Sequence, residues 1–382
     1  MSAPALRRLA RRLLRPGLLR EVAGAGADLR ALLLYSTQAF RGPDRSARHQ
    51  NIGQQRELAR ALGELGYAVD VVDFDETRRG LLTRDYDLVI DLHPRRAPLY
   101  QGRLRPGAVR IAYLTGSDPA ANAAAEARRI DELERRRGVR LRPRRAAEPV
   151  ARDVLEGFDA CFLFGDAVTR SSYHGLRWPT TYALPNNGYE VEPTDPARRE
   201  PGRLLFLGSV GQVHKGLDLL LEVVAAEPAL ALEVCCDLRQ EPDFARAYDR
   251  ELTATPNIRN HGFVDVTGAR FRDLQARCGA LVLPSCSEGQ SGSVTVGMGY
   301  GLPCAVSRWC GFDHPELTML HEIAPAALRS ALLALAARTP GELAAQSAAT
   351  LALFQRAYRP EHYAAAVRAA LRDLLGRRGG RA

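Results

Sequence analysis

The chain contains almost no lysine. Its 382 residues include 53 lysine and arginine residues together, and every one except Lys215 is an arginine. Codon usage in a GC-rich genome is the ordinary cause of such a bias, which makes the position of the exception informative. The seven cysteines show neither CxxC nor mixed Cys/His ligand spacing. This pattern argues against a disulfide framework or a structural zinc site and favours a reducing compartment.

Two further absences narrow the class of protein. No apolar run approaches the ~20 residues that a bilayer-spanning helix needs. No GxGxxG motif follows the first predicted strand, at 30–35. Asp73 and Asp75 end a strand where dinucleotide-binding proteins keep a ribose-binding acid, but without the glycine motif a dehydrogenase is a poor interpretation.

Positive charge is concentrated in two segments. The formal net charge is +9, of which residues 1–30 contribute +5 and residues 128–145 contribute +6, so the rest of the chain is slightly acidic. In the first segment Leu6, Leu9 and Leu13 share one helical stripe among arginines, which is typical of a helix on an anionic membrane surface; a solvated arm is the alternative. No aromatic residues are interleaved to stack bases, so we do not expect nucleic-acid binding. The second segment is predicted to face lipid phosphates, or else to be a solvated helical face with internal Glu/Arg pairs.

Apolar strands alternate with helical segments along most of the chain. The predicted strands lie at 30–35, 67–74, 85–94, 109–116, 158–165 and 180–187, and again at 203–208, 230–236, 257–264, 280–285 and 302–307. Among the helices between them is 51–66, with Asn51 as the expected cap and Gly66 as the stop. The alternation predicts an α/β fold of two doubly wound, Rossmann-like domains facing one another across a cleft.

The boundaries follow from composition. We expect a basic amphipathic arm at 1–28, an N-terminal Rossmann-like domain at 29–188, a Pro- and charge-rich linker at 189–202, a second domain at 203–355, and a C-terminal helix and tail at 356–382.

Lys215 follows a strand that ends at Gly208 and is expected to begin the next helix. Backbone N–H groups and the positive end of a helix make such a position an anion site, and a lysine adds a compact cation suited to a diphosphate oxygen. A solvated lysine in the first helical turn is the alternative. A second stretch, SEGQSG, also follows a strand, and there Glu288 stands beside a glycine-rich turn that lets the backbone approach a ligand. By itself Glu288 is equally consistent with a helix cap.

Three stretches of the second half carry a resemblance. FLGSVGQVHKGLDLLLE, NIRNHGFV and ALVLPSCSEGQSGSVTVGMGYGLPCAVS, in this order over residues 206–307, resemble the C-terminal domain of the retaining glycosyltransferases of the GT-B fold, the large group-one or GT4 family. The N-terminal half is similar only loosely. The resemblance implies transfer of a sugar from a nucleotide-diphosphate donor, with no protein nucleophile and usually no metal, in which the protein positions the reactants and stabilises the leaving diphosphate.

The resemblance also assigns roles to individual positions. It places Lys215 on the donor diphosphate and Glu288 on donor-sugar hydroxyls. It places three segments around the donor. They are the turn that ends the strand, with Gly208 and Ser209; the segment beside the base, with Phe263 and Val264; and the glycine-rich loop, with Gly289, Gln290, Ser291 and Gly292. Two positions depart from the pattern. Ser209 stands where the family often has an arginine that partners the lysine, and Val296 stands where a second acid usually holds the donor ribose.

Candidates in the N-terminal half follow predicted strands. His93 is expected to reach the sugar from the opposite wall of the cleft as the third catalytic residue, and Gly116 and Ser117 to approach the phosphates. His49 and Asn51, in a long loop before a helix, are expected to meet the acceptor.

The sequence thus predicts a metal-independent glycosyltransferase with a nucleotide-diphosphate sugar as donor substrate, no other cofactor, and a glycan or lipid-linked acceptor. We expect it in the cytoplasm at the inner face of a membrane, through 1–20 and 128–145, in the assembly of cell-surface polysaccharide or glycolipid. A catalytically degenerate domain of the same fold that binds a glycan or partner, and a nucleotide-sugar epimerase, remain the alternatives.

Overall fold

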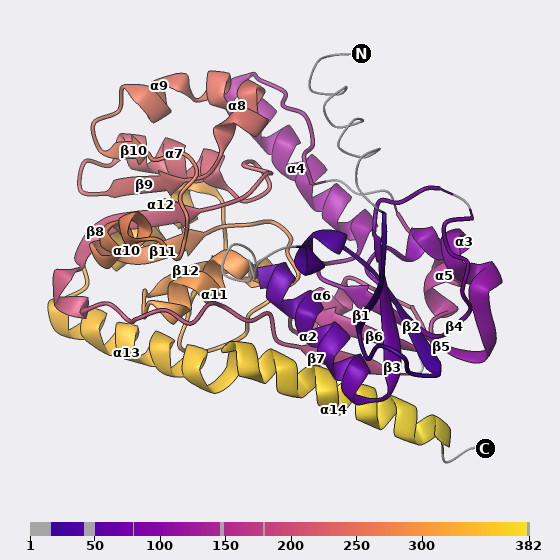
Figure 1. The fold of residues 1–382 in the computed structure, drawn as a ribbon. Helices are drawn as coiled ribbons and strands as arrows, with labels where there is room; N and C mark the ends of the chain where they lie inside the picture. The colour runs from indigo at the N-terminus through magenta and orange to yellow at the C-terminus, as the bar shows by residue number, and fades with distance from the viewer. Residues whose placement is uncertain (1–16, 42–49, 79, 146–148, 179, 380–382) are drawn as a thin grey trace.

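The computed structural model describes residues 17–41, 50–78, 80–145, 149–178 and 180–379, and places them in two domains, each built on its own sheet (Figure 1). The predicted α/β class with two parallel-sheet domains is confirmed. The stretch from 1 to 16, which includes most of the expected basic arm, and His49 lie outside the described residues.

The N-terminal sheet has seven strands in the order β1-β3-β2-β4-β5-β6-β7. The strands are β1 (Leu18–Ala23), β2 (Leu29–Tyr35), β3 (Tyr67–Asp73), β4 (Tyr86–Asp91), β5 (Leu104–Leu114), β6 (Ala160–Phe164) and β7 (Thr181–Leu184). All neighbours are parallel except β1, which pairs antiparallel with β3. β1 lies within the stretch assigned to the basic arm, and its irregular register between Leu19 and Ala23, with a positive φ at Glu21, explains why it lacks a strand pattern.

The C-terminal sheet has six parallel strands in the order β10-β9-β8-β11-β12-β13. They are β8 (Glu200–Leu207), β9 (Ala231–Cys235), β10 (Ile258–Asn260), β11 (Cys278–Leu283), β12 (Cys304–Ser307) and β13 (Thr318–Leu320). β8 begins inside the stretch assigned to the linker. β8 and β11 are neighbours, so the loops that follow them emerge side by side at the carboxyl edge of the sheet.

The helices are α2 (Gln50–Glu64), α3 (Ala97–Tyr100), α4 (Pro119–Arg137), α5 (Arg152–Glu156), α6 (Ala167–Ser171), α7 (Leu217–Ala226), α8 (Pro242–Ala247), α9 (Asp249–Thr253), α10 (Ala269–Ala276), α11 (Gly292–Gly299), α12 (Pro325–Ala336), α13 (Pro340–Ala357) and α14 (Pro360–Gly379). The described part of α2 begins at Gln50, so Asn51 lies inside the helix and is not its cap. Gly66, with φ +85°, follows that helix as expected.

Each domain sends one helix onto the other. α4 belongs to the N-terminal domain, yet Ile130 and Leu133 on its apolar face are buried in the core of the C-terminal domain. In return α14, at the end of the chain, buries Val367 and Leu371 in the N-terminal core against α2 (Figure 1). This exchange holds the carboxyl edges of the two sheets against one another and so positions the site.

Candidate active site

The centre of the site is an ion pair between the chain's one lysine and Glu288. Lys215 Nζ lies 2.5 Å from Glu288 Oε1, and the two side chains are only 5% and 9% exposed. Ser285 Oγ donates a second hydrogen bond to Glu288 Oε1, at 3.1 Å. The two residues come from the loops after the neighbouring strands β8 and β11, so the sheet topology brings them together. The prediction that both belong to one site is therefore consistent with their geometry.

The turn before α7 sets the direction of Lys215. Gly216 is the N-cap of α7 with φ +77°, and a Cβ there would lie 2.5 Å from the carbonyl oxygen of Pro284. Only glycine therefore fits at this crossing of the two loops. Lys215 stands two residues before the first residue of α7, and so lies outside the helix that it was expected to begin. Its side chain extends back along the loop and past Gly208, where an added Cβ would lie 3.4 Å from Lys215 Cδ.

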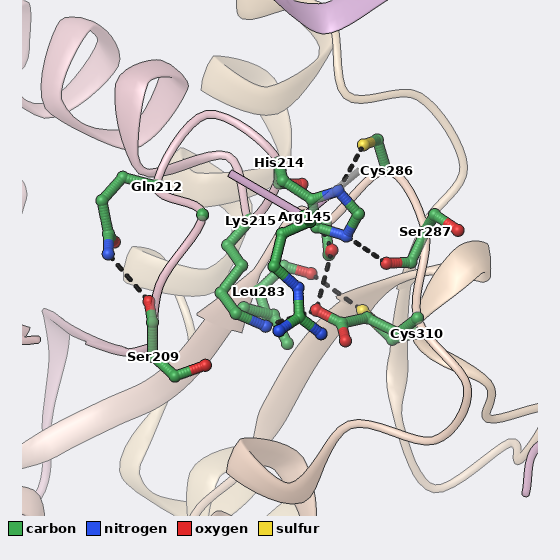
Figure 2. Close-up of polar contacts among 12 residues, drawn as sticks. Arg145, Ser209, Gln212, His214, Lys215, Leu283, Cys286, Ser287 and Cys310 are labelled. Carbon is green, nitrogen blue, oxygen red and sulfur yellow. Dashed lines mark hydrogen bonds and ion pairs between the residues drawn. The ribbon is translucent and has the colours of Figure 1, made fainter. Parts of the chain in front are cut away.

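Glu288 is ionised despite its burial. Burial, the largest single effect, raises the pKa of this carboxyl. The charges of Lys215, of His214 in its protonated form at low pH, and of Arg145 together outweigh burial, so that the pKa falls to about 2. His214 is fully buried beside it, with its Nε2 on the carbonyl oxygen of Ser287 and its Nδ1 3.6 Å from the sulfur of Cys286 (Figure 2). Burial lowers the pKa of His214 below its ordinary value. At neutral pH the centre thus holds a carboxylate, an ammonium and a neutral imidazole.

The expected anion site on the backbone of the β8–α7 loop is partly filled by the protein itself. The buried carboxylate of Glu241 accepts from the amides of Gly211, at 2.5 Å, and Gln212, at 3.2 Å. Gln212 also donates from its side chain to the carbonyl oxygen of Ser209, 2.8 Å away. These two amides are therefore not free for a ligand, and the cationic side chains must supply more of the attraction for an anion.

The glycine-rich loop lies directly against the N-terminal domain. Ser117 Oγ donates to the carbonyl oxygen of Glu288 at 2.6 Å. An added Cβ on Gly289 would lie 2.2 Å from the carbonyl oxygen of Thr115, so this glycine is required by close contact. Gly116, which adjoins both contacts, lies at the same place. The structure thus brings the 115–117 loop against the backbone of Glu288 and Gly289. The approach of Gly116 and Ser117 to donor phosphates stays a prediction.

Gln290 continues this contact between the domains. Asn186, after β7, donates its backbone N–H to Gln290 Oε1 at 2.6 Å and its side-chain amide to the Gln290 carbonyl oxygen at 2.7 Å. Ser291 precedes α11, and Gly292 is its first residue. The carbonyl oxygen of Gly292 accepts from Gln50 Nε2 of α2, at 3.3 Å.

The remaining predicted donor residues lie further from the ion pair. Phe263 is 72% exposed after β10, and Val264 is buried beneath it. Ser209 is exposed at the edge of the β8–α7 loop, and Val296 is buried in α11. Among the described residues no hydrogen bond or ion pair links these four side chains to Lys215 or Glu288. The roles of Phe263 and Val264 at a donor base and of Ser209 beside the donor stay predictions, and Val296 supplies no acid for a ribose.

His93 occupies a different part of the N-terminal edge. It follows β4 and packs against Phe74, with ring centroids 4.8 Å apart. Burial lowers the pKa of His93 to about 4, with smaller contributions from Arg95 and Arg96, so the imidazole is neutral at pH 7. Its backbone N–H donates to the buried carboxylate of Asp91 at 2.7 Å. Within the described chain no contact joins His93 to the ion pair, and its catalytic role stays a prediction.

Four of the nine arginines in the basic run at 128–145 join the two domains. Arg129 and Arg136 reach the buried carboxylate of Asp218 at 2.8 and 2.6 Å. Arg137 and Arg144 pair with Glu251 and Asp243 of the C-terminal domain. Arg140 pairs with acids of α4 itself. Ion pairs thus engage five of the nine arginines, and those of Arg140 are of the internal Glu/Arg kind that the alternative expected. That the remaining arginines face lipid phosphates stays a prediction.

A groove lies where α4 meets the C-terminal domain. It has a volume of about 410 Å³ and is lined on the α4 side by arginines that include Arg128 and Arg135, and on the other side by Cys286, Trp309 and Ile323. Arg128 and Arg135 are exposed and form no ion pair within the described part of the chain. The groove is therefore partly apolar and partly cationic.

Sequence reasoning missed several groups at the site. His214, Asn186 and Glu241 come from loops after strands, and their polar character at strand ends is a signal that could have identified them. Arg145 lies beside Lys215 although it comes from the N-terminal domain (Figure 2). Nothing in the local pattern distinguishes it from the other arginines of its run.

The comparisons with known proteins agree with this geometry. Residues 201–353 match the family model described as glycosyl transferases group 1. No curated protein sequence matches the chain. Among the described residues no helix is long and apolar enough to cross a membrane, and no cluster of three or more His, Cys, Asp or Glu side chains could hold a metal ion.

Solved structures share the fold. Sucrose-phosphate synthase from Thermosynechococcus elongatus superposes with a TM-score of 0.65 at 15% identity, over 91% of this chain and 99% of that one. HepE from Anabaena, in complex with UDP and glucose, gives a TM-score of 0.61 at 12% identity, over 91% and 99% of the two chains. At such identities the likeness shows the fold, which is the GT-B arrangement of two Rossmann-like domains.

Proposed function

We propose that this chain, which carries a group 1 glycosyltransferase domain at residues 201–353 within a GT-B fold, transfers a sugar from a nucleotide-diphosphate sugar to a glycan or lipid-linked acceptor with retention of configuration. HepE, which has the same fold, was solved with UDP and glucose and with UDP-glucose, which supports a donor of this class. We further propose that the enzyme needs no metal ion and works in the cytoplasm beside a membrane, in cell-surface polysaccharide or glycolipid assembly.

The observation that carries the proposal is the buried Lys215–Glu288 pair of the C-terminal domain, next to its contact with the N-terminal domain. A lysine at this position can place one positive charge on the leaving diphosphate, and the carboxylate can accept hydrogen bonds from sugar hydroxyls. In a site shielded from water, removing one such preorganised charge typically costs ~3–4 kcal/mol of transition-state stabilisation. The pair therefore provides both functions that the transfer requires from the protein at the donor.

The ionisation of Glu288 favours transfer over epimerisation. An epimerase would need carboxyl groups that exchange protons with the substrate near neutral pH. Lys215, His214 and Arg145 outweigh burial and hold the pKa of Glu288 at about 2, so this group stays ionised. A carboxylate that is ionised at neutral pH is suited to binding hydroxyls and poorly suited to general acid catalysis.

The groove beside α4 supports an amphipathic acceptor. Arg128 and Arg135 can meet phosphate charge there, while Trp309 and Ile323 offer apolar surface. A lipid-linked phosphate combines both properties, whereas a neutral glycan does not need the arginines. Vesicles that contain anionic lipid should therefore retain the protein more strongly than neutral vesicles, and Arg128→Gln/Arg135→Gln should reduce the difference.

Thermal unfolding in the presence of nucleotides tests the proposal. UDP, GDP, ADP, TDP and CMP would each be added to the wild type, to Lys215→Met and to Lys215→Met/Glu288→Gln. A ligand at about 100 times its Kd stabilises the folded state by ~2.7 kcal/mol, so one diphosphate should raise the Tm of the wild type clearly. The double variant removes both buried charges and keeps the site neutral, which separates loss of binding from loss of folding.

The matched control is Arg142→Gln, which removes an exposed positive charge from the same protein away from the ion pair. It should respond to the nucleotide like the wild type. If no nucleotide shifts the wild type, the donor site is not functional. The chain would then be a degenerate GT-B protein that binds a glycan or partner, as Val296 in place of the second acid would suggest.

A further inference from the structure

The ion pair leaves the donor site short of positive charge. Lys215 and Glu288 neutralise one another, and His214 is neutral because burial lowers its pKa. A nucleotide diphosphate brings at least two negative charges to the same place. The amides of Gly211 and Gln212, which could help, already bind Glu241. A further cation is required if a diphosphate is to bind there.

Arg145 is the cation that faces this position. Its side chain crosses the β8–α7 loop at Gly211, where an added Cβ would lie 2.5 Å from Arg145 Cγ. Figure 2 shows its guanidinium directed toward the end of the Lys215 side chain, and its charge contributes to the low pKa of Glu288. No carboxylate lies within ion-pair distance of this guanidinium in the part of the chain that the structure describes.

The position of Arg145 is fixed by α4. Its backbone N–H donates to the carboxylate of Glu126 at 3.0 and 3.1 Å, and its carbonyl oxygen accepts from Asn122 Nδ2 at 3.0 Å. α4 in turn is anchored on the C-terminal domain by the buried contact of Arg129 with Asp218. Arg145 is thus exposed, and its guanidinium has no ion-pair partner among the described residues, while the backbone that carries it is held in place from both domains.

We propose that Arg145, supplied by the N-terminal domain, is the second cation on the leaving diphosphate of the donor. It takes the role that the family resemblance assigns to an arginine at the position of Ser209. The donor site is then complete only when α4 is docked on the C-terminal domain. This inference rests on the proposed function, because it assigns a further residue to the same donor site.

During sugar transfer, negative charge develops on the diphosphate, next to the proposed position of the Arg145 guanidinium. The bond between C1 of the sugar and the diphosphate oxygen breaks, and its electron pair stays on the diphosphate. The acceptor oxygen forms the new bond to C1, and its proton passes to the departing phosphate oxygen. Negative charge therefore grows on the diphosphate, and a guanidinium beside Lys215 stabilises it with charge-assisted hydrogen bonds.

The test compares nucleoside diphosphates with monophosphates. The affinities of UDP, GDP, ADP and TDP, and of their monophosphates, are measured by isothermal titration calorimetry for the wild type, Arg145→Gln, Lys215→Met and Arg142→Gln. The ratio of diphosphate affinity to monophosphate affinity gives the contribution of the second phosphate. A charge-assisted hydrogen bond corresponds to about 10- to 100-fold in affinity. Arg145→Gln should weaken the diphosphate by that factor and the monophosphate much less. Arg142→Gln, the control from the same loop, should change neither.

A rescue variant separates this role from a structural one. Arg145→Gln/Ser209→Arg places an arginine on the opposite side of the loop and should recover most of the diphosphate affinity. Because Arg145 is exposed and its side chain has no polar partner among the described residues, the Tm of Arg145→Gln without nucleotide should equal that of the wild type.

Two results would overturn the inference, and they differ. Unchanged diphosphate affinity in Arg145→Gln, together with its loss in Lys215→Met, leaves the donor site in place and refutes the role of Arg145 alone. A wild type that binds none of the diphosphates refutes the proposed function and, with it, this inference.

Discussion

The contact between α4 and α7 is expected to couple the stability of the two domains. Asp218 is fully buried in the first turn of α7 and accepts from both Arg129 and Arg136. Arg129 is itself only 4% exposed. In Asp218→Asn the two arginines lose their shared buried carboxylate and keep only Glu132 and Glu222, which are partly exposed. Removing one partner of a buried pair costs ~3–5 kcal/mol. Arg129→Met should cost less, because Arg136 still pairs with the carboxylate.

A double-mutant cycle gives the coupling itself. Asp218 also interacts favourably with the N-terminal end of α7, which contributes ~0.3–1 kcal/mol. That contribution is lost in Asp218→Asn and in Arg129→Met/Asp218→Asn alike, so it cancels in the cycle. The coupling energy between Arg129 and Asp218 should then reach ~1.5–3 kcal/mol, the upper part of the range for residues in direct contact.

The chain offers one spectroscopic probe for each domain. Its two tryptophans are Trp178, in the N-terminal domain, and Trp309, which lines the groove beside α4. Trp178→Phe leaves the probe of the C-terminal domain, and Trp309→Phe leaves the probe of the N-terminal domain. With Asp218 intact, the two variants should unfold in urea at the same midpoint, and with Asp218→Asn added their midpoints should differ. A coupling energy below ~0.5 kcal/mol, or transitions that stay coincident, would show that the ion pair does not hold the domains together.

Three further outcomes are expected. Gly289→Ala places a Cβ against the carbonyl oxygen of Thr115 and should lower both the Tm and nucleotide binding, whereas Gly341→Ala, with open space around it, should change neither. Burial raises the pKa of Asp91 to about 7, above its value in the unfolded chain. The free energy of unfolding should therefore be highest below pH ~4 and should fall by up to ~4 kcal/mol as the pH rises to 7. Urea unfolding of Asp91→Asn at the same pH values should lack this decline. Deletion of 360–382 removes α14 and exposes the N-terminal core, so the product should aggregate and bind a hydrophobic dye. A soluble product that unfolds cooperatively would contradict the packing of α14 on this core.

The sequence predicts the strands that are buried on both faces, because continuous apolar runs such as those of β2 and β11 are typical of strands in the interior of a parallel sheet. It misses β1 and β13, which lie at sheet edges, since an edge strand buries few residues and needs no apolar run. It also places the N-terminal boundary after β1, because the charged residues of that strand resemble those of the arm.

The residues of the candidate site likewise fall into a part that the sequence predicts and a part that it does not. Lys215 and Glu288 each follow a strand, and parallel neighbours bring their loops to one edge, so a shared site follows from pattern and topology. The contribution of Arg145 depends on the docking of α4, which is decided by Asp218, 89 residues from Arg129 in sequence. No local rule connects residues at that separation. For the same reason the basic run could not be recognised as a domain contact from its composition.

The geometry also explains why an arginine-rich chain keeps a lysine at this position. The Lys215 side chain passes through a narrow space beside Gly208 and ends on one oxygen of Glu288. A guanidinium is larger, and its planar fork binds a carboxylate through two parallel hydrogen bonds, which would hold it on Glu288. An ammonium group makes a single contact that a phosphate oxygen can replace without a change in the backbone. The lysine can therefore pair with Glu288 before a donor binds and with the diphosphate afterwards. An arginine suits the open position of Arg145, but in place of Lys215 it would stay paired with Glu288.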